Sequence, residues 1–273
     1  MKSRSLSLAM FGAAGLMVLS ACKNDAPPAQ PAAPTPTASA KQPEQAPATP
    51  PAAPAAPAAP VGGRGSVRGV VKFNGTAPAL ADIAPSADPA CEGMALKEQS
   101  VVVKDGKLAN VLVRVRGEVA GAAAAPSEAV VVDQQKCTYV PRVQGAMKGQ
   151  SIMVKNSDGT MHNVRGLAGT KGLFNLAQPP SAPPVTKPVP GDVEVLNLKC
   201  DVHPWMRAFI AVSPHPYFVT TGEDGGFSLA NLPEGTYTLE AWHESLGTKT
   251  AEITVKDGAA AEASFEFSAT DKG

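Results

Sequence analysis

Short runs in which apolar and polar residues alternate recur from residue 65 onward, and Gly, Pro, Asn and Asp residues separate them. An alternation with a period of two is typical of strands that bury one face, and this region shows no convincing helical period. The expected strands cover residues 67–73, 100–103, 109–115, 129–133, 151–155, 192–199, 207–212, 227–229, 236–242 and 249–255. So many short strands predict an all-β fold built from sandwiches.

The beginning of the chain has a different pattern. Lys2 and Arg4 precede an apolar run over residues 6–19, which is too short to be a permanent membrane span and is typical of a signal peptide. The run ends in the residues LSAC, and Cys22 is the last of these. The sequence therefore predicts an exported protein with a signal peptide over residues 1–21.

The LSAC ending resembles the lipobox of bacterial lipoproteins, in which the cysteine is acylated and becomes the new N-terminus. The resemblance implies lipidation at Cys22. Lys23, and not an aspartate, follows the cysteine. The resemblance therefore also implies that the protein is anchored in the outer membrane and faces the periplasm or the cell surface. The alternative is an ordinary secretory cleavage site with an incidental cysteine.

Residues 22–62 are expected to form a disordered tether. Residues 26–60 are almost wholly Ala, Pro, Thr and Gln, with twelve prolines and no aromatic residue. Such a composition cannot bury a core, and its proline density favours an extended polyproline II chain. A disordered segment without a spacer role is the alternative.

Charge excludes one class of partner. The full chain has 24 basic and 24 acidic residues, and removal of the signal peptide leaves a net charge of about −2. No basic field remains that could hold nucleic acid, so we expect no nucleic-acid partner.

One loop between two expected strands combines three metal-binding side chains. Two residues separate Cys200 from His203, and two more separate His203 from Met206. A soft thiolate, two imidazoles and a weak axial thioether are the ligands of a blue-copper site. The strands fix the ends of such a loop, so the second imidazole must come from elsewhere, and His162 meets that demand.

The region between residues 130 and 212 resembles a cupredoxin. The resemblance rests on a strand at 139–143, a turn at 148–150 leading into 151–158, the residues MHNV at 161–164, and the loop CDVHPWM at 200–206, which is similar to that of amicyanins. It implies a Greek-key β-sandwich over residues 121–213 that holds one type 1 copper. His162, Cys200 and His203 would be the equatorial ligands and Met206 the axial ligand.

Other metal sites fit these residues less well. A zinc site would typically have more His or Cys ligands and no Met. A c-type haem would need a second cysteine beside the histidine. A site without any metal is the remaining alternative.

The resemblance also implies an electron-transfer route. In cupredoxins the histidine of the cysteine loop exposes its edge within an apolar patch, so Pro204 and Trp205 would surround an exposed His203 and receive a redox protein partner. The backbone N–H of Asn163 would bond the sulfur of Cys200. A long Pro-rich stretch between residues 166 and 191 departs from the compact pattern.

Residues 220–267 resemble a second sandwich, the prealbumin-like, carboxypeptidase regulatory-like domain, through the residues TGEDGGF at 221–227 and LPEGTYTL at 232–239. Its first two strands resemble residues 65–71 and 110–115. We therefore expect an N-terminal β segment over 63–120 and a C-terminal sandwich over 214–273, with the cupredoxin inserted into a split domain. Two sandwiches in tandem are the alternative.

Export places the cysteines in an oxidising compartment. With Cys22 assigned to lipid and Cys200 to metal, Cys91 and Cys137 remain as a natural disulfide pair. The alternative is that either of them is a metal ligand.

Three function classes follow. The first is a carrier of single electrons, the second a copper-binding chaperone or sensor, and the third a carbohydrate- or protein-binding surface module. His243 and Glu244 are adjacent, but no nucleophile or second carboxylate accompanies them, so we expect no enzyme with a turnover of its own.

Overall fold

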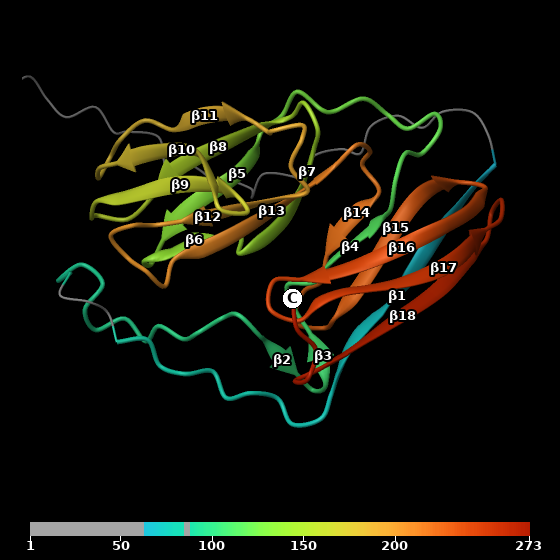
Figure 1. Ribbon diagram of the computed structural model, residues 1–273, viewed down its shortest axis with the longest axis horizontal. Helices are drawn as coiled ribbons and strands as arrows, with labels where there is room; N and C mark the ends of the chain where they lie inside the picture. The colour runs from blue at the N-terminus through green and yellow to red at the C-terminus, as the bar shows by residue number, and fades with distance from the viewer. Residues whose placement is uncertain (1–62, 85–87) are drawn as a thin grey trace, which may run out of the picture. The chain divides into compact units, whose positions relative to one another are not determined.

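The computed structural model describes residues 63–84 and 88–273, and every regular element in this part of the chain is a β-strand (Figure 1). The predicted all-β class is confirmed. The signal peptide, the lipidated Cys22 and the tether lie outside the described residues. No helix of the described part is long and apolar enough to cross a membrane.

The strands follow one another along the chain in the order of their labels. The first nine are β1 (Arg64–Asn74), β2 (Val103–Lys104), β3 (Lys107–Leu108), β4 (Leu112–Val115), β5 (Val130–Gln135), β6 (Thr138–Val140), β7 (Val143–Met147), β8 (Ser151–Asn156) and β9 (His162–Ala168). The other nine are β10 (Lys171–Gln178), β11 (Val185–Pro188), β12 (Val195–Lys199), β13 (Arg207–Ser213), β14 (Phe218–Thr220), β15 (Gly226–Pro233), β16 (Gly235–His243), β17 (Gly247–Val255) and β18 (Ala260–Ser268).

One sandwich contains strands from both ends of the described chain. Strand β1 pairs antiparallel with β15 and parallel with β18, and β4 lies between β14 and β16 in the facing sheet. Val67, Val113, Leu239 and Phe267 belong to the core between these sheets, and each is fully buried. Strands at residues 64–74 and 112–115 therefore complete the sandwich that the C-terminal strands form.

A second sandwich forms between β4 and β14 along the chain. One sheet has the strand order β10-β9-β12-β13-β7, and the other has the order β11-β8-β5-β6 (Figure 1). Ile152, Val164, Leu198 and Ile210 are fully buried in its core. The alternation of apolar residues predicted β8 and β12, because each of them buries one face on this core. Strand β13 is instead a continuous apolar run that is buried on both faces.

The structure differs from the expected strands at several places. The expected strands do not include β14 and β18, and residues 100–102 lie outside any strand. The strand expected over 139–143 is two strands in different sheets, because the chain turns at residues 141–142 between β6 and β7. Much of the stretch expected as a Pro-rich crossing forms the β9–β10 hairpin and the edge strand β11. Its prolines lie in the connection and at the end of an edge strand, where their missing N–H groups cost no ladder hydrogen bond.

Candidate metal centre

Three neighbouring strands place the predicted ligands. His162 is the first residue of β9, and Cys200 directly follows β12. Lys199 at the end of β12 pairs with Arg207 at the start of β13, so both ends of the 200–206 loop are fixed by one antiparallel pair. On its other side, Lys199 pairs with Arg165 of β9. This pairing brings the start of β9 beside the loop.

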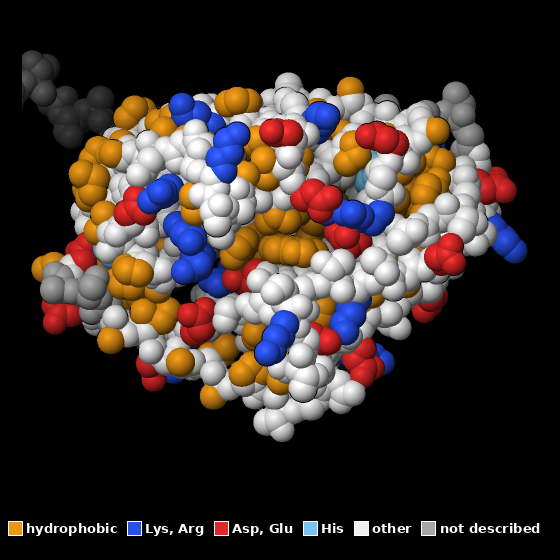
Figure 2. Space-filling model, viewed as in Figure 1, with side chains coloured by type: hydrophobic (Ala, Val, Ile, Leu, Met, Phe, Trp, Pro, Cys, Tyr) orange, Lys and Arg blue, Asp and Glu red, His pale blue; other side chains and the backbone are white. Residues whose placement is uncertain are grey.

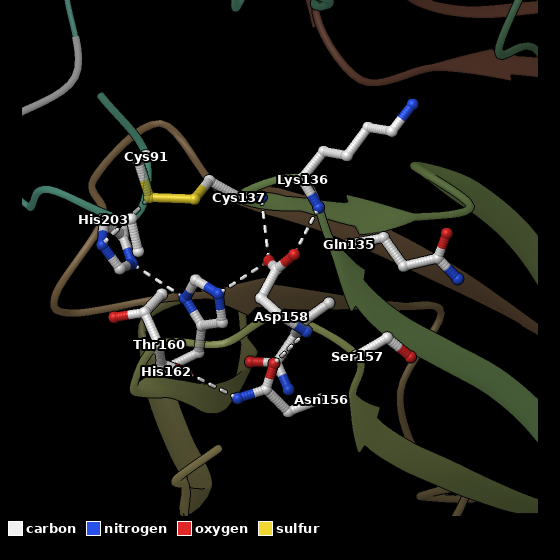
Figure 3. A network of polar contacts seen from close by, with 12 residues as sticks. Cys91, Gln135, Lys136, Cys137, Asn156, Ser157, Asp158, Thr160, His162 and His203 are labelled. Atoms are coloured by element: carbon white, nitrogen blue, oxygen red, sulfur yellow. Dashed lines mark hydrogen bonds and ion pairs between the residues drawn. A yellow bond between two sulfur atoms is a disulfide. The ribbon is translucent and has the colours of Figure 1, made fainter. Parts of the chain in front are cut away.

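The structure brings His162, Cys200 and His203 together. One ligand atom from each of them lies within 4.8 Å of the others. The two Nδ1 atoms are 2.8 Å apart, and the Cys200 sulfur lies 3.8 Å from the Nδ1 of His203 (Figure 3 shows the two imidazoles). Both histidines are fully buried and Cys200 is 4% exposed. The cluster contains two imidazoles and a soft sulfur, which is the donor set that copper prefers.

A carboxylate holds the outer nitrogen of each imidazole. Asp158 Oδ2 lies 2.9 Å from His162 Nε2, and Asp88 Oδ2 lies 2.9 Å from His203 Nε2. A carboxylate only accepts hydrogen bonds, so each Nε2 carries a proton, and in a neutral ring Nδ1 is then the nitrogen with the lone pair. Metal-binding histidines commonly have such outer carboxylates, which fix the tautomer and the ring orientation.

The pKa shifts of Asp88 and His162 agree with this arrangement. The backbone N–H of Ala90 and then the hydroxyl of Thr160 hold the pKa of Asp88 below its usual value. Burial lowers the pKa of His162, against the opposing effect of Asp158. A neutral His162 with a free Nδ1 is the state that binds a metal ion.

The sulfur of Cys200 has polar neighbours of its own. The backbone N–H of His203 donates to it at 3.4 Å, and its S–H group lies 3.4 Å from Asn163 Oδ1. Asn163 Oδ1 also accepts from the backbone N–H of Asp201 at 2.7 Å. The sequence predicted the backbone N–H of Asn163 as the donor to the sulfur, and the structure places the side-chain oxygen of this residue there.

Met206 lies at the end of the loop and is 1% exposed. Its backbone N–H donates to the carbonyl of His203 at 2.9 Å, and its carbonyl accepts from the N–H of Cys200 at 3.3 Å. The loop thus closes on itself, and Met206 packs in the same core cluster as Cys200. Its role as the axial ligand remains a prediction.

The predicted disulfide between Cys91 and Cys137 is confirmed. Two further groups of candidate ligands each contain one of these half-cystines, namely Asp88 with Cys91 and His203, and Asp158 with Cys137 and His162. The disulfide occupies both sulfurs, so the thiol available to a metal among the described residues is that of Cys200.

The expectation of an exposed His203 is wrong. Its ring is 0% exposed, because the Cys91 sulfur lies 3.7 Å from Nε2 and Asp88 is bonded to the same atom. The covering residues precede the cupredoxin-like region in the sequence, so the loop motif gives no sign of them. Of the predicted patch, Pro204 is exposed and Trp205 is partly exposed.

Trp205 connects the buried histidine to the surface. Its ring packs against His203 with the centroids 5.1 Å apart, and its Nε1 donates to the carbonyl of Cys137 at 2.9 Å. Val202 on the same loop is 48% exposed, and Met161, beside His162, is 47% exposed. The apolar surface near the site therefore includes Val202 and Met161 as well as the two predicted residues.

Sequence reasoning also missed Gln178. This residue pairs with His162 across the β9–β10 hairpin, is 1% exposed, and has an amide without a hydrogen-bond partner among the described residues. Directly paired residues on neighbouring strands present their side chains to the same face. Buried amides ordinarily find partners, so the unpaired amide is an unusual feature of the strand pair that carries His162. The two imidazoles and the thiol of the cluster are a donor set that fits a copper ion.

The other two histidines lie outside the cluster. Burial lowers the pKa of His243 to about 4, and its Nδ1 accepts the backbone N–H groups of Ser245 and Leu246. His215 is fully buried beside Ser213. Glu244 forms an ion pair with Arg142. These contacts give His243, Glu244 and His215 structural roles.

Comparison with known proteins gives results for two parts of the chain. Residues 204–268 match the sequence model of the carboxypeptidase regulatory-like domain. A reduced amicyanin mutant is similar in structure, with 20% identity and a TM-score of 0.29 over 37% of this chain and 98% of its own. A copper-containing nitrite reductase from Thermus scotoductus SA-01 has 19% identity and a TM-score of 0.27 over 36% of this chain and 25% of its own. No curated protein matches the chain.

Proposed function

We propose that this chain is an exported, lipid-anchored type 1 copper protein that carries single electrons between redox partners. The observation that carries the proposal is the buried cluster of His162, His203 and Cys200, in which both Nδ1 atoms face each other at 2.8 Å. With Met206 as a weak axial ligand, these residues would hold one copper ion. Copper supplies the change between Cu(I) and Cu(II), which transfers one electron.

The residues around the cluster would keep it rigid during that change. The β12–β13 pair fixes both ends of the ligand loop, and Asp158 and Asp88 fix the two rings. Cu(I) and Cu(II) prefer different coordination geometries. A rigid site with an intermediate geometry therefore minimises rearrangement when an electron is transferred. The apolar core around Cys200 would contribute to the potential of the site.

Because His203 is covered, we assign the exit of electrons to Trp205. This residue contacts the His203 ring, is partly exposed, and has exposed Val202 and Pro204 as neighbours in the sequence. An exposed apolar surface of this kind suits brief docking of a redox protein. On the face drawn in Figure 2, basic and acidic side chains are interspersed, so neither sign dominates there.

The test is the visible spectrum of the protein after it is loaded with Cu(II). We expect a strong thiolate-to-copper band that disappears on reduction and returns on oxidation, with Cys200→Ser as the control without a thiolate. Labile Cu(I) binding without this band would contradict the proposal and favour a copper-carrying or sensing role. Glycan binding without copper binding would favour a surface-binding module.

A further inference from the structure

A short segment outside both sandwiches covers the candidate metal centre. We call residues 88–97 the cystine strap, because Cys91 fastens this segment to Cys137 in the turn between β5 and β6. Cys91 and Cys137 are fully buried, and Trp205 of the ligand loop packs on their cluster. The strap is therefore part of the packing around the loop.

Asp88, the first residue of the strap, connects it to the ligand His203. Its Oδ2 lies 2.9 Å from His203 Nε2 and also accepts the hydroxyl of Thr160 at 2.8 Å. Its Oδ1 accepts the backbone N–H of Ala90 at 2.9 Å. Three donors thus fix the carboxylate, and the carboxylate determines which nitrogen of His203 carries the proton.

The other half of the cystine supports the second imidazole. The backbone N–H groups of Lys136 and Cys137 donate to Asp158 at 2.6 and 2.8 Å, and Asp158 holds His162 Nε2 (Figure 3). One disulfide thus joins two carboxylates that each face one imidazole. Figure 3 shows the cystine beside both rings.

We propose that Asp88 is a positioning residue of the copper centre: held by the cystine strap, it keeps His203 covered and turns Nδ1 toward the metal. This inference rests on the proposed copper function. Asp88 acts through His203 and does not itself bind the metal. The strap adds a support from outside the 200–206 loop, since Asp88 bonds Nε2 of His203 while Cys200 of the loop lies beside Nδ1.

The first experiment measures the tautomer of His203 without any metal. Nitrogen-15 NMR of the metal-free protein should show His203 protonated at Nε2, with this proton protected from exchange. In Asp88→Ala the protection should disappear, and Asp88→Asn should retain part of it, because the amide oxygen can still accept the bond. An Nε2 proton that is equally protected in folded Asp88→Ala protein would overturn the proposal.

The second experiment measures copper. Loss of an outer partner of a metal-binding histidine typically costs about 10- to 100-fold in metal affinity, so we expect Asp88→Ala to lower the Cu(II) affinity by that factor and to change the visible spectrum. The matched control is Asp82→Ala, since Asp82 pairs with Lys97 of the strap and its side chain is 80% exposed. It should leave affinity and spectrum unchanged, and thermal unfolding should show both variants folded.

The two failures are distinguishable. If the unmodified protein gives no thiolate band with copper, the proposed function fails, while the NMR experiment still decides whether Asp88 sets the tautomer of His203. If the unmodified protein is blue and Asp88→Ala has the same affinity and spectrum, the copper function stands and the positioning role is wrong.

Discussion

His162 Nδ1 lies 2.8 Å from His203 Nδ1, while a carboxylate holds the Nε2 of each ring. With both Nε2 atoms protonated, the two Nδ1 lone pairs point at each other inside a buried site. Two unshared lone pairs at this distance repel, and either a proton shared by the two nitrogens or a metal cation between them removes the repulsion. The pair of rings is therefore arranged for a positive charge at their centre, which is the physical basis for the predictions on copper.

Replacement of the two predicted sulfur ligands should have different effects. Cys200→Ser should abolish the visible band, because the thiolate carries the charge transfer, whereas Met206→Leu should keep the band and shift the reduction potential. Visible spectra and redox titrations of both variants check this. Complete loss of colour in Met206→Leu would contradict the axial assignment.

The disulfide should make a large contribution to stability. Its half-cystines are 46 residues apart, and closure of such a loop stabilises a fold by about 4 kcal/mol in the chain-entropy model. We expect a Cys91→Ala and Cys137→Ala double variant to lose free energy of unfolding of this order in urea titrations. An unchanged midpoint in folded double-variant protein would show that the loop is held by other contacts.

The sequence predicted the parts of the site that depend on local spacing. Cys200, His203 and Met206 lie on one loop between two alternating strands, so their proximity follows from the pattern. The approach of His162 needed the resemblance to a family, since it comes from another strand.

The residues that support the ligands could not be predicted in the same way. Asp88 lies 115 positions from His203 in the chain, and its contact depends on a disulfide that brings an irregular segment over the loop. Gln178 lies beside His162 only because the stretch after β9 folds into a hairpin with a particular register. The prediction of an exposed His203 edge was wrong for the same reason. Residues far away in the sequence cover His203, and the hydrophobic pattern of the loop does not reveal them.

His243 should make stability depend on pH. Burial, and then the charge of Arg142, lowers its pKa to about 4, against an ordinary value of 6.5 in the unfolded chain. As the pH falls, the unfolded state therefore binds a proton before the folded state does. The free energy of unfolding should decrease by up to about 3 kcal/mol between pH 6.5 and pH 4. Urea titrations of metal-free protein at several pH values should show a smaller loss in His243→Asn. Equal losses in both proteins would contradict this role.

Lipidation at Cys22 makes a prediction about location. Cys22→Ala should release the protein from membranes into the soluble exported fraction, because acyl chains rather than a transmembrane helix would anchor it. Fractionation and mass analysis of the N-terminal peptide measure the two properties independently. An unmodified N-terminal peptide on the natural protein would exclude the anchor.

A charge placed on the exposed loop should slow electron exchange with the redox partner. Val202 is 48% exposed and lies between the predicted ligands Cys200 and His203, so a glutamate there can remain in solvent while the four predicted ligands keep their positions. Docking removes water from an apolar contact, and an unpaired carboxylate in that contact opposes docking. We expect Val202→Glu to lower the second-order rate constant of electron transfer with the physiological partner and to leave the visible spectrum almost unchanged.

Val131→Glu is the matched control, because Val131 is 38% exposed on β5 and lies outside the ligand loop. Equal rates for both variants and the unmodified protein would show that the partner docks elsewhere.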